Sequence, residues 1–150
     1  MTIFFEDLTV GQIFTTPRRT ITVADIVQFA GLSGDFNPLH TDDLYAAENG
    51  YGRRIAHGPM LVGMAFGLIS RVGLLDGTAL ALLEINWKFG LSVSPDDTIH
   101  VRVTVTGVRP SRKADRGVVE LDIEIVNQRN ETVQTGRAKI LLKTRDTGSL

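Results

Sequence analysis

Apolar and polar residues alternate with a period of two over much of the second half of the chain. Every second residue is Ile or Val in residues 99–105, and residues 119–125 repeat the alternation with Val, Leu and Ile. Such a period puts alternate side chains on opposite faces, so both segments are predicted to be half-buried antiparallel strands. Residues 132–143 read as another strand, whose phase shifts across Gly136 as at a β-bulge. Further strands are predicted at residues 80–89 and 13–21.

A helical period replaces this alternation in the first half of the chain. Thr22 is followed three residues later by Asp25, a variant of the capping box, and apolar residues at helical spacing then predict a helix to about Gly31. A second helix is predicted to begin at Thr41 and to end at the Asn-Gly pair of residues 49–50.

A third and longer helix is predicted to begin at Gly58-Pro59, because proline is favoured at the first helical position. It continues to Val72 and is almost entirely apolar or Gly, so we expect protein to surround most of it. The strand at residues 80–89 carries Trp87 and Phe89 on the same face as Ile85, which indicates a core face turned toward this helix.

The order of these elements indicates an α+β fold. One strand, a helical insert and a long helix precede an antiparallel meander of four strands, so a sheet is expected to wrap around one central helix. A charged hairpin, "RPSRKADRG", joins two of the strands, and "NQRNE" forms the next turn. Because the sequence shows no repeat, linker or low-complexity segment, residues 1–150 are predicted to be one domain.

Composition narrows the classes of function. The chain of 150 residues has no cysteine, which excludes disulfides and thiolate chemistry. Its net charge of −1 gives no long-range attraction for nucleic acid or an anionic membrane. The N-terminus lacks the pattern of a signal peptide, and the apolar run at residues 60–70 is too short for a membrane span. We therefore expect a cytoplasmic protein.

The stretch "SGDFNPLH", residues 33–40, carries more chemistry than a turn needs. Asn37 precedes a proline and is pushed out of the helical region, so Asp35 and His40 lie on either side of a forced turn. Such a turn can aim a carboxylate and an imidazole at one water, the first as base and the second to orient it. Taken singly, Asp35 is equally typical of an Asx turn, and His40 of a surface or core histidine.

A second stretch, "RRIAHGPML", delivers the N-terminus of the long helix. Unpaired N–H groups and a partial positive charge at this end can stabilise an oxyanion that develops on a carbonyl. Pro59 has no N–H, so the predicted donor is Gly58, which also lets a thioester approach closely, with Met60 as the substitute.

Together these residues resemble the MaoC-like, or R-specific, enoyl-CoA hydratases, which have the hot-dog fold. The signature of that family is Gly-Asp-x-Asn-Pro-aliphatic-His, followed about 17 residues later by Ala-His-Gly. The resemblance also extends through "VADIVQFAGLSGD" and "INWKFGLSVSPDDTIHVRVTV". The matching positions are Gly34, Asp35, Asn37, Pro38, Leu39, His40, Ala56, His57 and Gly58.

This resemblance implies a single hot-dog domain whose helical insert, residues 23–50, overhangs the acyl group. It implies syn addition of water to a trans-2-enoyl thioester, giving an (R)-3-hydroxyacyl thioester, or the reverse dehydration. Asp35 and His40 would activate the water, and Gly58 would bind the thioester oxygen. Asn37 and Pro38 would shape the loop.

Other positions are assigned more loosely. His57 either braces the helix start or takes part in catalysis. Phe66 stands near the place where some family members carry a hydroxyl residue, and it would narrow the acyl pocket. His100 alternates with buried valines and is expected at the surface. Arginine and lysine side chains suited to coenzyme phosphates, or simply to a solvated turn, are Arg53, Arg54, Arg109, Arg112, Lys113 and Arg116.

No metal is predicted, because three histidines without cysteine or paired ligand spacing do not make a typical site. No cofactor is expected beyond coenzyme A as part of the substrate, and acyl carrier protein is the alternative carrier. The resemblance implies a homodimer or higher homo-oligomer. Two alternatives stay open: an acyl-CoA thioesterase, and a binding or catalytic subunit of a heterodimeric 3-hydroxyacyl-ACP dehydratase.

Overall fold

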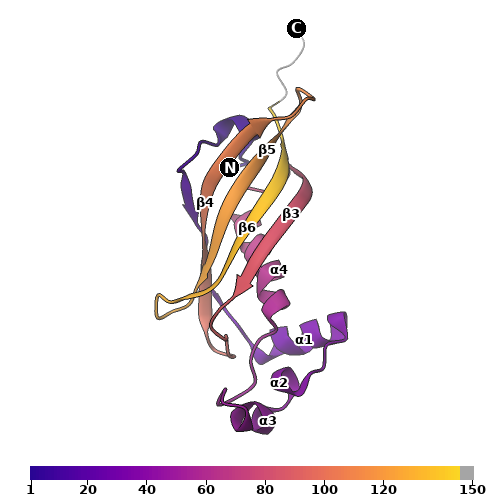
Figure 1. Ribbon diagram of the computed structural model, residues 1–150, viewed down its shortest axis with the longest axis vertical. Coiled ribbons are helices and arrows are strands. Elements are labelled where there is room, and N and C mark those ends of the chain that lie inside the picture. The colour runs from indigo at the N-terminus through magenta and orange to yellow at the C-terminus, as the bar shows by residue number, and fades with distance from the viewer. Residues whose placement is uncertain (146–150) are drawn as a thin grey trace.

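A computed structural model describes residues 1–145 and shows one strongly bent antiparallel sheet with a helix on its inner face (Figure 1). The strands lie in the order β1-β4-β5-β6-β3, and the short β2 pairs with β4. The strands are β1 (Ile13–Thr15), β2 (Arg19–Thr20), β3 (Ala79–Phe89), β4 (Thr98–Pro110), β5 (Arg116–Val126) and β6 (Thr132–Lys143).

The long helix lies behind the sheet, and the other α-helices extend beyond one end of it (Figure 1). A 3-10 turn, η1 (Phe5–Asp7), begins the chain. The α-helices are α1 (Val23–Ser33), α2 (Pro38–Thr41), α3 (Asp43–Glu48) and α4 (Gly58–Arg71). The predicted α+β fold with a central helix and a helical insert is therefore confirmed.

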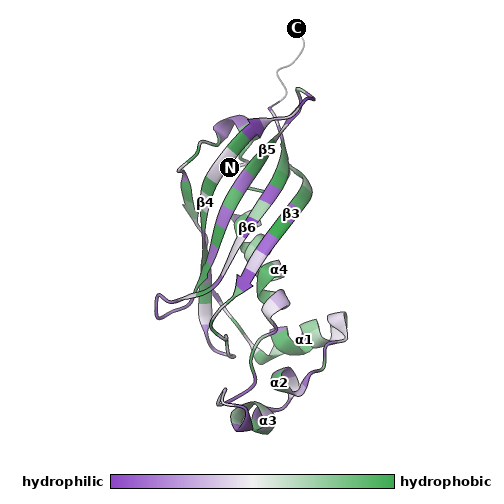
Figure 2. Cartoon of the chain, in the orientation of Figure 1, coloured by the Kyte–Doolittle hydropathy of each residue, from purple (hydrophilic) through white to green (hydrophobic). Residues whose placement is uncertain are grey.

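The predicted alternation is present in the strands. In β4 the side chains of Ile99, Val101, Val103 and Val105 are buried, and the polar residues between them face outward. Figure 2 shows the same striping along β4 and β5. The inner face and α4 share one apolar core, which supplies the main stabilising burial.

The predicted meander of four strands is wrong in one connection. β4, β5 and β6 are consecutive neighbours, but β3 pairs with β6 at the far edge of the sheet instead of with β4. The segment after β3 therefore crosses to the other side of the sheet. Sequence patterns predict strands but not partners, because pairing depends on how the whole sheet closes around α4.

The phase shift expected at Gly136 exists in β6 but lies nearer the start of the strand. The pairing of β6 with β5 is irregular at residues 132–134, where Val133 is fully buried. Gly136 itself pairs regularly with Trp87 and Ile123, and from Gln134 onward the even-numbered residues face inward. Glycine is needed at 136 because the Trp87 ring occupies the space that a Cβ atom would take.

The inner face of β3 is less buried than predicted. Ile85 and Phe89 lie on the inner face of β3 but are 41% and 57% exposed. On α4, Gly63 and Gly67 are exposed. α4 makes its main strand contacts with β4, three positions away from β3 in the sheet. The inner face of β3 is therefore an apolar surface that this chain leaves largely open.

The helical insert begins as predicted and then differs in detail. Thr22 and Asp25 form the capping box of α1, which ends at Gly34 in a left-handed conformation, φ 77°. The second predicted helix corresponds to α3, which starts later than predicted because Asp42 and not Thr41 caps it. Residues 38–41 form the extra helical turn α2.

No helix in residues 1–145 combines the length and the apolar character that crossing a membrane requires.

Candidate active site

The local turns of the insert position Asp35. Gly34 reverses the chain at the end of α1, and Asp35 is the next residue. Its Oδ1 accepts a hydrogen bond from the Asn37 N–H at 3.1 Å. The Asn37 side chain in turn accepts from the Leu39 N–H and caps α2. The turn chemistry of the sequence is therefore present, and it leaves the second carboxylate oxygen of Asp35 free to face His40.

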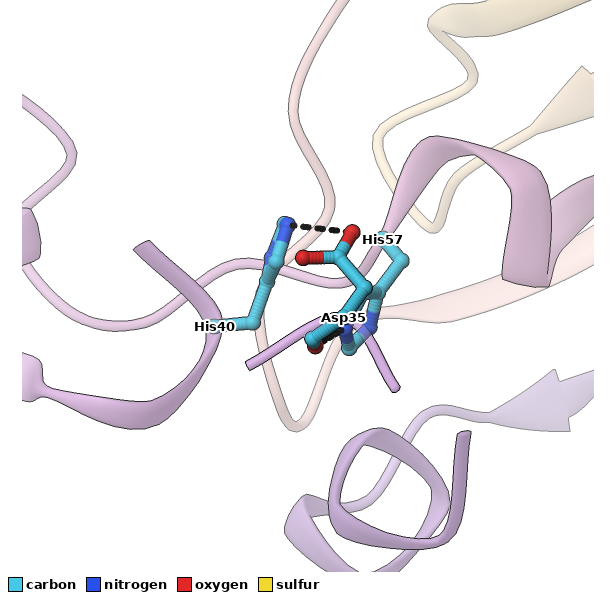
Figure 3. Close-up of side chains that lie close together, drawn as sticks. All are labelled: Asp35, His40 and His57. Carbon is cyan, nitrogen blue, oxygen red and sulfur yellow. Dashed lines mark hydrogen bonds and ion pairs between the residues drawn. The ribbon is translucent and has the colours of Figure 1, made fainter. Parts of the chain in front are cut away.

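The backbone of the segment before α4 holds His40. Nδ1 of its ring lies 2.8 Å from the Ile55 carbonyl oxygen. Because a carbonyl only accepts, Nδ1 carries the hydrogen, and Nε2 of the neutral ring has a free lone pair. Nε2 faces Asp35 Oδ2 at 4.0 Å (Figure 3). The pair thus presents two acceptors to the space between them.

That separation suits one water molecule. An oxygen at about 2.8 Å from each of two acceptors can bridge atoms 4.0 Å apart, with an angle of about 90° at the water. Both protons then point at Asp35 and His40, and a lone pair of the water faces outward. The Asp35 side chain is 50% exposed and that of His40 12%, so the carboxylate side of this gap is the more open one.

His57 contacts both Asp35 and His40. It is fully buried, and its Nε2 donates to the backbone carbonyl of Asp35 at 2.9 Å. Its ring stacks on His40 with centroids 3.8 Å apart and packs against Phe29 on the other side. Of the two roles considered for His57, this geometry supports bracing: its ring has no exposed atom to offer a substrate.

The same three residues lie close enough together to be considered as a metal site. One ligand atom each from Asp35, His40 and His57 lies within 4.8 Å of the others. However, imidazole lone pairs lie in the ring plane, and the two rings are stacked with their planes only 26° apart. The lone pairs therefore do not converge on one point, and the cluster fits a water better than a metal ion.

The start of α4 lies next to this cluster in the chain, with His57 as N-cap and Gly58 as the first helical residue. The first N–H groups of a helix have no intrahelical partner. A Cβ atom on Gly58 would lie 2.8 Å from Phe89 Cδ1, so a larger residue there would displace that ring. Met60 is buried in the core and Phe66 is half-buried beside Trp87, with ring centroids 6.4 Å apart.

Two of the arginines considered for coenzyme phosphates form ion pairs. Arg54 donates two hydrogen bonds to the Asp43 carboxylate, and Arg53 pairs with Asp96. Hydrogen bonds from the Arg54 side chain and backbone lower the pKa of Asp43 to about 2. Both arginines belong to the segment that leads to Gly58, and their contact with coenzyme phosphates stays a prediction.

The other residues predicted to contact coenzyme phosphates do not lie beside the site within this chain. Arg109, Arg112, Lys113 and Arg116 belong to the hairpin between β4 and β5, at the end of the sheet opposite the helical insert (Figure 1). His100 is half-buried, and burial together with Arg102 and Arg18 lowers its pKa.

Two residues beside the site were not predicted from the sequence. Gln134 on β6 is buried and hydrogen-bonded to the Gly58 carbonyl, and Ile55 supplies the carbonyl that orients His40. A backbone carbonyl leaves no signal in a sequence. Gln134 did leave one, a polar residue at an inward position of β6.

A large hollow, about 750 Å³, lies on the outer face of the sheet instead of at this cluster. Its lining includes the ion pairs Arg137–Asp122 and Lys139–Glu84. A surface so charged does not suit an acyl chain, and the sheet separates it from α4.

Comparison with known proteins agrees with the fold. Residues 6–127 match the family described as MaoC like domain. The (R)-specific enoyl-CoA hydratase of Aeromonas caviae is 33% identical over 137 residues, which cover 91% of this chain and 97% of that protein. Protein MaoC of Klebsiella aerogenes is 43% identical over 75% of this chain, which spans only 34% of that relative.

Solved structures show the same architecture. The MaoC-like dehydratase from Rhodospirillum rubrum superposes with a TM-score of 0.85 at 30% identity, over 95% of this chain and 98% of that one. A Mycobacterium tuberculosis protein described as having a double hotdog fold gives a TM-score of 0.87 at 21% identity, over 99% of this chain and 46% of that one. The chain therefore belongs to the MaoC-like dehydratase family and has its hot-dog fold. The expectation of an enzyme of the hydratase and dehydratase class is confirmed.

Proposed function

We propose that the protein adds water to the double bond of a trans-2-enoyl thioester to give an (R)-3-hydroxyacyl thioester, or catalyses the reverse dehydration. The observation that carries this proposal is the 4.0 Å gap between Asp35 Oδ2 and His40 Nε2, two acceptors positioned around one water. The name of the Aeromonas caviae relative supports the substrate class and the stereochemistry.

In the proposed reaction, Asp35 and His40 each accept a hydrogen bond from the same water. As the oxygen of the water bonds to C3 of the acyl group, Asp35 takes one proton from it. The carboxyl group then returns that proton to C2. Because the oxygen and the proton both come from the side on which Asp35 lies, the addition is syn, and one water supplies every atom that is added.

Negative charge builds on the thioester oxygen while C3 is attacked. The Gly58 N–H, at the positive end of α4, is the donor proposed to stabilise it. The ring of Phe89 over Gly58 and the half-buried Phe66 would line the path of the acyl chain. Coenzyme A enters only as part of the substrate, and neither a metal nor another cofactor has a step in this scheme.

The test is to mix the purified protein with crotonyl-CoA and with a longer enoyl-CoA. Loss of the conjugated-enoyl absorbance measures hydration, and chiral analysis identifies the product. We expect an (R)-3-hydroxyacyl-CoA. An (S) product, or no turnover at any chain length, would overturn the proposal.

A thioesterase would use the same carboxylate and helix N-terminus but would release free coenzyme A. The His40 ring 4.0 Å from the Asp35 carboxylate supports water addition, since it gives the water a second group that can orient it. Thiol release in the same reaction mixture, followed with a thiol reagent, distinguishes the two activities.

We also propose that a second copy of this chain covers the open inner face of β3. Leu82, Ile85 and Phe89 are 41–57% exposed on a face that is otherwise core. The neighbour with a double hotdog fold supports this proposal. This chain covers 46% of that protein, so the rest of that protein is long enough for a second unit of the same size. A different hot-dog chain, as in a heterodimeric dehydratase, is the alternative partner. A cytoplasmic location stays a prediction.

A further inference from the structure

Gln134 is a buried amide in an apolar row. It is 4% exposed on the inner face of β6, in line with Ala138, Ile140 and Leu142. Burying an amide in apolar surroundings is costly unless its donors and acceptors are hydrogen-bonded. The partners that Gln134 finds therefore indicate what the residue does.

Both ends of the Gln134 amide are used, and its orientation is fixed. The indole Nε1 of Trp87 donates to Oε1 at 2.8 Å. Because the indole N–H can only donate, the oxygen of the amide must face Trp87, and the nitrogen must face the other way. Nε2 then donates to the carbonyl oxygen of Gly58 at 3.3 Å. The chain Trp87–Gln134–Gly58 thus links the edge strand β3 and its neighbour β6 to the first residue of α4.

The neighbouring residues are shaped around this link. Gly136 has no side chain, so the Trp87 ring lies flat on β6 at the height of Gln134. Phe89 covers Gly58 so closely that a Cβ atom there would be 2.8 Å from its ring. Glycine has more backbone freedom than any other residue type. At Gly58 this freedom is reduced, because Gln134 holds the carbonyl and the Phe89 ring covers the Cα.

We propose that Gln134 is a positioning residue that fixes the direction of the Gly58 N–H toward the thioester oxygen. The inference rests on the proposed function, in which that N–H stabilises the oxyanion. The hydrogen bond from Gln134 holds the peptide plane that follows Gly58, and the N–H lies in the peptide plane that precedes it. The two planes meet at the Gly58 Cα, which the Phe89 ring covers. A donor displaced by about 1 Å can cost 10²-fold in rate, so a group that touches no substrate can still set turnover.

The test compares Gln134→Glu and Gln134→Leu with wild type and with Thr135→Val, the adjacent exposed residue on the other face of β6. Glu keeps the acceptor for Trp87 and loses the donor to Gly58, whereas Leu loses both. With crotonyl-CoA we expect kcat to fall about 10- to 100-fold in both Gln134 variants, KM to change less than about threefold, and the pH profile to keep its shape. Thr135→Val should match wild type.

A second readout does not depend on turnover. The 1H–15N signal of Gly58 should shift, and its amide should exchange faster, in both Gln134 variants, while amides of the β4–β5 hairpin stay unchanged. If wild type turns over enoyl-CoA but folded Gln134 variants keep kcat within twofold, the positioning role is wrong. An unchanged Gly58 signal also overturns it. No turnover by wild type would instead refute the proposed function and leave the Gly58 signal to decide on Gln134.

Discussion

At the scale of single residues, Asp35 does two separate jobs with its two oxygens. Oδ1 accepts from the Asn37 N–H and holds the turn, while Oδ2 faces His40. The turn interpretation of this residue is therefore confirmed for Oδ1, while the catalytic interpretation concerns Oδ2 and stays a prediction. Replacing the carboxylate by an amide separates them, because Asn keeps an oxygen for the turn and loses the base.

Asp35→Asn is expected to lower kcat about 10²- to 10⁴-fold, the usual scale for a lost general base, with an unchanged circular dichroism spectrum. Asp42→Asn is the matched control. It makes the same change at the N-cap of α3, where Asn caps as well as Asp, and should keep wild-type turnover. Retention of most activity by Asp35→Asn would show that the carboxylate is not the base.

At the scale of elements, the insert is held to the rest of the chain by few specific contacts. Its helices are short, and only Ile26, Ala30 and Ala46 of α1 to α3 are buried. The Arg54–Asp43 ion pair joins α3 to the segment that leads into α4, and it also carries a backbone hydrogen bond from Arg54. It therefore connects the two halves of the site.

This pair predicts a dependence on pH with a definite sign. The pKa of Asp43 is about 2 in the folded protein, below the unfolded value of about 3.9, so its stabilisation is complete above that value. It is lost as the pH falls through about 2. In urea unfolding, Asp43→Asn should be less stable than wild type at pH 7, and the difference should shrink between about pH 4 and 2.

Glu48→Gln changes another carboxylate on α3 and serves as the control for that measurement. A difference between Asp43→Asn and wild type that stays constant down to pH 2 would contradict the role of the ion pair. The interaction is exposed, so its contribution should also decrease in high salt.

At the scale of the whole molecule, the main feature without a packing partner in the described chain is the apolar inner face of β3. Isolated exposed apolar residues are ordinary, but a row of them on the core face of an edge strand indicates an interaction surface. Covering that face with a second copy would also close the side of α4 where Gly63 and Gly67 are exposed.

Wild type is therefore expected to sediment with twice the mass of the 16.4 kDa chain or a higher multiple. Ile85→Glu should shift it toward the single chain, because a charge buried in an apolar interface is unpaired. Val10→Glu introduces the same charge at a 62% exposed residue just before β1, at the opposite edge of the sheet, and should not change the mass. A monomeric wild type would refute the self-association.

The sequence by itself determined the local features of this protein. The alternation of β4 and β5, the capping box at Thr22, the helix start at Gly58 and the motif around Asp35 and His40 all depend on neighbours within a few residues, so patterns along the chain reveal them. The motif also indicated the family, because the same chemistry needs the same residues at the same spacing.

Only the tertiary structure decided the contacts between distant segments. It placed β3 beside β6, set the His40 tautomer with the Ile55 carbonyl, stacked His57 on His40, and turned Gln134 toward Gly58. It also left the inner face of β3 exposed, where the sequence predicted core. These outcomes depend on how the sheet closes around α4 and on which face each side chain then meets, and no local pattern carries that information.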